Sequence, residues 1–292
     1  MKIDLQKPKG TYRIAHISDL HFAKASYGLC QFFSKRWIGN LNLIFFRNRQ
    51  FDPRQLDSLP DLFKQMHVDC VLITGDLTTT SLKEEFEQAL FFVRKFEENK
   101  IAVELLPGNH DHYTKKAYAE RLFYEYFPSP SSSGINVKKL TKEWWLITLD
   151  CALATSLLSS QGEFSPELEQ ALHEALAAIP PQQNVLIANH FPLFQQEGIR
   201  KALLRSEALR KQLSFSPQIK LYLHGHCHRH CIADLRASNL PIILDSGSTA
   251  ERKGGTWNLI DLNAHGCEVQ SFKHADSPSS PWQPLKKASF VW

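Results

Sequence analysis

The sequence predicts a layered α/β domain, and three observations support that prediction. The chain has 292 residues, of which 43% are hydrophobic and 22% charged, so it can bury a sizeable core. Short apolar runs bounded by Gly, Pro or Asp alternate with longer stretches of 3.6-residue periodicity. Polar residues collect directly after several of the apolar runs. Strands that alternate with helices in this way are typical of sheets covered by helices.

The predicted strands are short apolar runs, several of them rich in β-branched residues. They cover residues 12–18, 70–74, 101–106, 145–149, 185–188, 220–223 and 241–244. Residues 256–262 and 267–273 are predicted as a closing hairpin around residues 263–266.

The predicted helices follow from 3.6-residue periodicity. They cover residues 54–67, 82–99, 115–127, 165–179 and 196–213, and Ser165-Pro166 is typical of a cap followed by a first-turn proline. We expect one domain over residues 1–275, with an insertion at residues 22–53 after the first strand. A Ser/Pro-rich aromatic tail would follow at residues 276–292.

Composition limits the class of protein. The six cysteines form no CxxC pair, so they are predicted to be free thiols in a reducing compartment. The N-terminus lacks the apolar segment of a secretory signal, and no apolar run approaches the roughly 18–20 residues of a spanning helix. We therefore expect a cytoplasmic protein that can still lie on a membrane surface. The net charge of +4 does not by itself indicate a nucleic-acid partner, and none is expected.

Polar side chains follow five of the predicted strands, where each strand ends. Because ligands bind beyond the carboxyl ends of strands in α/β sheets, we expect these side chains to meet in one crevice. Carboxylate, amide and imidazole donors without thiolate suit Mn²⁺, Fe, Zn²⁺ or Ni²⁺. They are too many for one ion, so we expect two divalent cations about 3.5–4 Å apart, with Mn²⁺ as the first candidate. The positions are Asp19-x-His21, Gly75-Asp76, Gly108-Asn109-His110-Asp111, His190 and Gly225-His226-x-His228.

Each motif also has an ordinary interpretation. Gly-Asp after a strand is often a turn, because Asp caps helices, and a lone histidine such as His190 is often part of a core. The metal interpretation is favoured because all five strand ends carry donors in order. His112 and His230 flank the motifs; they are interpreted as ordinary histidines, with substrate contact as the alternative.

Together these motifs resemble the complete motif set of the calcineurin-like metallophosphoesterases, over about residues 13–248. The resemblance implies a four-layer αββα sandwich with a dinuclear metal site at the carboxyl edge of the strands, and hydrolysis of a phosphorus–oxygen bond. His110 would face the phosphate, and Asp111 would orient His110. One metal would take Asp19, His21, Asp76 and His228, and the other would take the bridging Asp76, Asn109, His190 and His226.

The insertion contains no Asp or Glu between residues 22 and 51. A basic, aromatic stretch beside a phosphate site indicates a membrane-surface element or a lipid cradle. The alternative is that these side chains cover the core. The apolar stretch 153–158 and the tail residues Trp282, Phe290 and Trp292 could extend such a surface. The candidate substrate-binding residues are Arg36, Arg47, Arg49, Phe32, Phe33 and Phe45.

The whole pattern resembles most closely a branch of the UDP-2,3-diacylglucosamine pyrophosphatases of bacterial lipid A synthesis. The usual form of that enzyme carries a helical lid after Gly-Asn-His, where this chain has no room, whereas here the insertion follows the first metal motif. The resemblance implies a lipid-linked nucleotide substrate, cleaved to UMP and 2,3-diacylglucosamine 1-phosphate at the cytoplasmic face of the inner membrane. The alternatives are a soluble cyclic-nucleotide or general phosphodiesterase and a non-catalytic scaffold.

Overall fold

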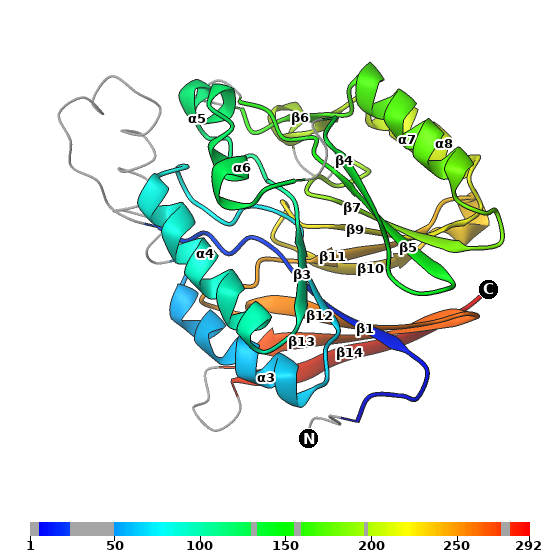
Figure 1. The fold of residues 1–292 in the computed structure, drawn as a ribbon, viewed down its shortest axis with the longest axis horizontal. Coiled ribbons are helices and arrows are strands. Elements are labelled where there is room, and N and C mark those ends of the chain that lie inside the picture. Colours follow the sequence, from blue (N-terminus) through cyan, green and yellow to red (C-terminus); the bar gives the residue numbers. More distant parts are fainter. Residues whose placement is uncertain (1–5, 24–49, 130–132, 155–158, 196–197, 276–280) are drawn as a thin grey trace.

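The computed structural model describes residues 6–23, 50–129, 133–154, 159–195, 198–275 and 281–292. Two six-stranded sheets pack face to face, and helices cover their outer faces (Figure 1). The described residues therefore form the predicted four-layer αββα sandwich.

The first sheet has the strand order β14-β13-β12-β1-β2-β3. Its parallel part comprises β1 (Tyr12–Ile17), β2 (Cys70–Ile73) and β3 (Ala102–Leu105). Its antiparallel part comprises β12 (Thr256–Asn263), β13 (Gly266–His274) and β14 (Trp282–Val291).

The second sheet has the order β10-β11-β9-β7-β5-β4. Its four central strands run parallel: β5 (Trp144–Leu149), β7 (Asn184–Asn189), β9 (Ile219–His224) and β11 (Ile242–Ser246). The antiparallel edge strands are β4 (Ile135–Lys139) and β10 (His230–Asp234), while β6 (Gly162–Glu163) and β8 (Leu203–Leu204) pair separately.

The helices divide between the two outer faces (Figure 1). The first sheet is covered by α3 (Leu59–Gln65) and α4 (Lys83–Glu98), while α5 (Lys115–Ala119) and α6 (Leu122–Tyr126) lie beyond one end of α4, with α6 packed on it. The second is covered by α7 (Pro166–Ala178) and α8 (Ser206–Ser214). The 3₁₀ turns are η3 (Pro53–Ser58), η4 (Ile199–Lys201) and η5 (Arg236–Ser238).

Strand alternation separates three apolar layers. On β1, Ala15 and Ile17 point into the core under α3 and α4, whereas Ile14 points into the layer between the sheets. The second sheet packs against α7 and α8 through residues such as Leu172 and Leu209. Each sheet is thus buried on both faces, which explains why its central strands read as continuous apolar runs.

Two helix predictions were wrong. Residues 196–213 do not form one helix: the described part contains η4, β8 and then α8. Residues 115–127 form two short helices, because Arg121 has a φ of 52° and interrupts the helix. Beyond residue 275, where we expected a tail, β14 pairs with β13 along the first sheet, and Trp282, which could have extended a lipid-facing surface, is buried in the core.

The insertion and its candidate substrate-binding residues lie outside the described residues. Phe32, Phe33, Arg36, Phe45, Arg47 and Arg49 all fall within residues 24–49. Only the two ends of the insertion, including Phe22 and Phe51, are described, and both are buried. None of the described helices combines the length and apolar character needed to cross a bilayer.

Candidate dinuclear metal centre

The predicted metal ligands meet where the carboxyl ends of the two sheets face each other. The first sheet supplies residues that follow β1, β2 and β3, and the second supplies residues that follow β7 and β9. The loops after β1 and β2 run side by side, because the backbone N–H groups of Asp19 and His21 donate to the carbonyls of Gly75 and Asp76 at 3.0 Å. This pairing holds the residues that follow β1 and β2 next to each other at the carboxyl edge of the sheet.

One group of ligand atoms comprises Asp19, His21 and His228, all within 4.8 Å of one another. The Nε2 atoms of His21 and His228 are 3.3 Å apart, and His228 Nε2 lies 3.1 Å from Asp19 Oδ1. These residues come from two different sheets, so the fold rather than local sequence brings them together.

A second group comprises Asp19, Asp76 and His190, also within 4.8 Å. His190 Nε2 lies 3.5 Å from Asp76 Oδ2, 3.3 Å from Asn109 Oδ1 and 3.2 Å from His226 Nδ1. Asp19 belongs to both groups, while Asp76 Oδ2 lies between His190 and His21, whose Nε2 is 4.0 Å away. Both carboxylates are therefore placed between the two sets of imidazoles.

These separations fit metal ligation. Two ligand atoms that each lie about 2.1 Å from one ion at an angle of about 100° are about 3.2 Å apart. The imidazole nitrogens of His21 and His228, and those of His190 and His226, are 3.3 and 3.2 Å apart. Imidazole nitrogens and carboxylate oxygens that point at one another with their lone pairs repel, unless a cation or a proton lies between them. The donor set thus suits two divalent cations, without fixing which metal they are.

Two glycines leave room for the carboxylates. A Cβ at Gly108 would lie 2.2 Å from Asp76 Oδ1, and one at Gly225 would lie 2.4 Å from Asp19 Oδ2 and 2.0 Å from Ser18 Oγ. No side chain fits at these distances, so Gly is required beside each carboxylate.

The ionisable groups of the centre have strongly shifted pKa values. Burial by itself would raise the pKa of Asp76, but His190 and His110 outweigh it and hold that pKa well below its ordinary value. Burial would lower the pKa of His190, but Asp76 outweighs it and raises that pKa to about 9. Burial and the neighbouring His190 lower the pKa of His226 to about 3.

His110 and Asp111 do not interact as we expected. The carboxylate of Asp111 accepts hydrogen bonds from the backbone N–H groups of Leu77, Thr78 and Gly108, at 3.1, 2.8 and 2.9 Å. The Nδ1 of His110 instead lies 2.8 Å from the carbonyl oxygen of Thr79. Asp111 thus joins the loops after β2 and β3, and the Thr79 carbonyl orients the His110 ring.

Some supporting residues carry no signal in the sequence. The carbonyl of Thr74 lies 2.7 Å from His190 Nδ1 and so directs Nε2 at the metal site. Phe51 packs on His21 and His228, with ring centroids 4.3 and 5.4 Å apart. A backbone carbonyl is available at every residue, so only the fold identifies Thr74. Phe51 could have been suspected only from its place at the end of the insertion.

Comparison with known proteins agrees with this geometry. The model of the calcineurin-like phosphoesterase family matches residues 12–230. A dimetal phosphatase from Danio rerio has a TM-score of 0.68 at 13% identity, over 96% of this chain and 98% of that one. A purple acid phosphatase from yellow lupin (Lupinus luteus) seeds has a TM-score of 0.59 at 12% identity, over 98% and 54%.

Vps29 from Chaetomium thermophilum has a TM-score of 0.45 at 10% identity, over 97% of this chain and 99% of that one. No curated protein sequence matches the chain. At such identities the structural likeness shows the fold, whereas the family model spans most of the chain and includes every predicted ligand. The chain therefore belongs to the calcineurin-like phosphoesterase family and is a hydrolase.

Proposed function

We propose that this hydrolase cleaves the pyrophosphate bond of UDP-2,3-diacylglucosamine, giving UMP and 2,3-diacylglucosamine 1-phosphate at the cytoplasmic face of the inner membrane. Hydrolysis of a phosphorus–oxygen bond is supported by the convergence of imidazole and carboxylate groups from five strand ends, whose neighbouring ligand atoms are 3.1–3.5 Å apart. The lipid-linked substrate is supported by the sequence resemblance and by two features described below.

The residues of the centre have distinct tasks in this reaction. The metal holders would be Asp19, His21, Asp76, Asn109, His190, His226 and His228. Two bound divalent cations would supply Lewis acidity and activate a water molecule. Because the Thr79 carbonyl holds Nδ1 of His110, a substrate oxygen would meet the ring at Nε2. His110 can then stabilise negative charge on the phosphoryl oxygens.

The leaving group makes a strong acid unnecessary. Attack of water at the phosphorus next to uridine breaks the bond between that phosphorus and the bridging oxygen, and the sugar phosphate departs with this oxygen. A phosphate monoester has a second pKa of about 6, so the departing group needs no full protonation at neutral pH. His110 is therefore expected to act mainly by its charge and its hydrogen bond.

The first supporting feature is the position of the insertion. The insertion begins at Phe22, directly after His21, and the chain is described again from residue 50, where the ring of Phe51 packs on His21. Both ends of the basic, aromatic segment are thus fixed beside the metal centre. Such a segment is well placed to hold the acyl chains of a substrate whose phosphates are bound at that centre.

The second supporting feature is the exposed loop after β7. Phe194 and Ile199 are exposed, at 39% and 68%, and the exposed Arg200 and Lys201 lie beside them. The carbonyl of Lys201 lies 3.1 Å from His226 Nε2, so this apolar and basic surface borders the centre. Exposed apolar side chains next to cations suit the surface of an anionic membrane.

A product assay tests the proposal. UDP-2,3-diacylglucosamine, cyclic AMP and bis(p-nitrophenyl) phosphate are each incubated with Mn²⁺ and with Mn²⁺ plus excess chelator. We expect UMP and the lipid monophosphate to form with Mn²⁺ and not with chelator. Turnover of cyclic AMP without the lipid nucleotide would instead identify a soluble phosphodiesterase. A folded chain that hydrolyses none of the three would point to a scaffold.

A further inference from the structure

A cavity of about 370 Å³ opens at the same strand edge as the candidate metal centre. Its lining includes His112, three residues after Asn109, and Asp150, which directly follows β5. In the second sheet β5 lies next to β7, and β7 is followed by His190. Asn189 also donates to the Sγ of Cys151, in the cavity lining, at 3.4 Å. The cavity therefore lies one strand along the edge from the phosphoesterase ligands.

His112 has no hydrogen-bond partner for either ring nitrogen among the described residues, although it is only 2% exposed. Asp150 Oδ2 is 3.9 Å from Nε2, beyond hydrogen-bond distance. Aromatic rings enclose the imidazole, with the Tyr118 and Phe123 centroids 5.1 and 6.1 Å away. Leaving a buried polar group without a hydrogen bond is unfavourable, so a bound molecule that supplies a hydroxyl partner would be favoured here.

The charged residues that line the cavity indicate what kind of molecule it can bind. The cavity is lined by two carboxylates, Asp150 and Glu163, against one guanidinium, Arg121. The resulting negative balance disfavours a second phosphate group. The carboxylates can accept hydrogen bonds from hydroxyl groups, and the guanidinium can donate hydrogen bonds to them. Tyr118, which is 43% exposed, adds an aromatic face for the apolar side of a ring.

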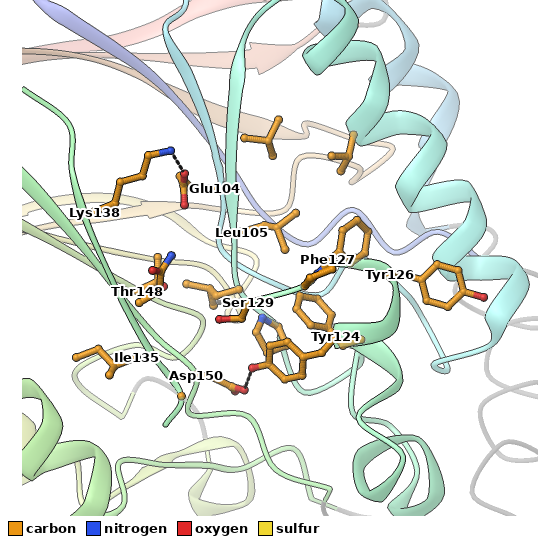
Figure 2. A pocket seen from close by; sticks show the side chains of 18 of the residues that line it. Glu104, Leu105, Tyr124, Tyr126, Phe127, Ser129, Ile135, Lys138, Thr148 and Asp150 are labelled. Atoms are coloured by element: carbon orange, nitrogen blue, oxygen red, sulfur yellow. Dashed lines mark hydrogen bonds and ion pairs between the residues drawn. The ribbon is translucent and has the colours of Figure 1, made fainter. Parts of the chain in front are cut away.

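Asp150 is held in place for such contacts. Its Oδ1 accepts from the N–H of Ala152 at 3.0 Å, and its Oδ2 accepts from the hydroxyl of Tyr124. Figure 2 shows this pair in the lining of a neighbouring cavity of about 440 Å³, where Lys138 also reaches Glu104. Tyr124 and Asp150 line both cavities, so this hydrogen-bonded pair lies where they meet.

We propose that the 370 Å³ cavity is a subsite for the ring of the departing sugar phosphate, with a ring hydroxyl bonded to His112 and the ring face against Tyr118. The subsite rests on the proposed function, because the ring belongs to the sugar phosphate that departs from the pyrophosphate cleaved at the metal centre. It gives the enzyme a preference for sugar phosphates over phosphate esters that carry no hydroxylated ring.

The test measures inhibition of bis(p-nitrophenyl) phosphate hydrolysis by the full chain with Mn²⁺. The inhibitors are glucosamine 1-phosphate, which carries a sugar ring, and inorganic phosphate, which does not. The wild type should be inhibited at a lower concentration by glucosamine 1-phosphate. His112→Phe and Tyr118→Ala should each weaken this inhibitor by about 3- to 10-fold, the effect of one lost contact, and leave inhibition by phosphate unchanged.

His274→Phe is the matched control, because His274 packs edge-on against Trp282, at a centroid distance of 5.0 Å, away from the cavity. It should keep the full preference for glucosamine 1-phosphate. Tyr118 is exposed, so its variant keeps the test available if His112→Phe does not fold. Equal inhibition by the two compounds in the wild type, or an unchanged preference in both variants, would overturn the subsite. If the wild type shows no metal-dependent hydrolysis, the proposed function itself is overturned.

Discussion

Five of the predicted metal ligands have positive φ angles: Asp19, His21, Asp76, His226 and His228, between 49° and 72°. Non-glycine residues adopt this region at a cost, and such strain persists only where surrounding contacts enforce it. Here the enforcing contacts are the paired loops after β1 and β2 and the bond from the His226 N–H to Asp19 Oδ2, at 3.0 Å. The backbone thus turns each side chain inward at the strand end.

Asp76→Ala should reduce hydrolysis of bis(p-nitrophenyl) phosphate by more than about 100-fold, because loss of a ligand exceeds the effect of losing a ligand's supporting contact. The fold should survive, since the apolar layers on both faces of each sheet hold the strands in place. Steady-state kinetics over a Mn²⁺ titration measures the loss of hydrolysis, and circular dichroism measures whether the fold survives. Asp57→Ala, at an exposed aspartate, is the control. Near-normal activity in Asp76→Ala would contradict the assignment of the site.

Metal binding should release a proton from His190. Its pKa of about 9 in the metal-free chain lies above the ordinary 6.5, so the charged ring stabilises the metal-free fold below about pH 6.5. This stabilisation is lost as the pH rises through 9. Because the metal needs the neutral imidazole, Mn²⁺ affinity should rise with pH up to about 9. Calorimetry in two buffers of different ionisation enthalpy measures the released proton, and equal heats in both at pH 7.5 would contradict it.

At the scale of secondary structure, β14 makes a specific contribution to stability. It pairs with β13 over its whole length, and Trp282 at its start is buried among Trp257 and Phe272. Trp282→Ala should lower the free energy of unfolding by about 3–5 kcal/mol, because it leaves a large cavity. Urea unfolding measures the loss. Leu285→Ala, on the same strand and 50% exposed, should cost far less, and equal losses would show that Trp282 is not a core residue.

Buried central strands were predictable and edge strands were not. Residues 70–74 and 185–188 are continuous apolar runs, because β2 and β7 are covered on both faces. The edge strand β4 has the sequence INVKK and is mostly exposed, so it carries no such run. The tail seemed polar for the same reason: on β14 only Trp282 is fully buried.

The candidate centre was predictable because its residues follow predicted strands in fixed motifs. The partners of its side chains were not, since the Thr79 carbonyl rather than Asp111 meets the His110 ring. The 370 Å³ cavity was not predicted either. His112 and Asp150 are 38 positions apart in the sequence, and only the two-sheet packing brings them to one cavity. Periodicity describes faces of single elements, and it contains no information on contacts between sheets.

At the scale of the whole molecule, the candidate metal ligands divide between the two sheets. Asp19, Asp76 and Asn109 come from the first sheet, and His190, His226 and His228 come from the second. The ion pair between Glu104 and Lys138 joins the edge strands β3 and β4, but exposed pairs contribute at most about 1 kcal/mol. The alignment of the sheets therefore depends on the apolar layer between them, which includes Ile14 and Leu186.

Replacing Phe32, Phe33 and Phe45 with Ser should lower turnover of UDP-2,3-diacylglucosamine and spare that of bis(p-nitrophenyl) phosphate. The reason is that these apolar side chains would contact acyl chains rather than the phosphates. Steady-state kinetics on both substrates measures the split. Phe91→Ser with Phe215→Ser, at residues 66% and 75% exposed on α4 and after α8, is the control. An equal fall on both substrates would mean that the insertion is structural.

The close approach of Phe51 to His21 has an evolutionary consequence. Where a segment leaves and re-enters a domain at neighbouring points, its length and composition can change with little disturbance to the framework. Selection could thus remodel the segment between Phe22 and Phe51 while every cation-holding side chain stays in place. The same bond-breaking apparatus could then be redirected to a new phosphorylated compound by exchanging one contiguous stretch of chain.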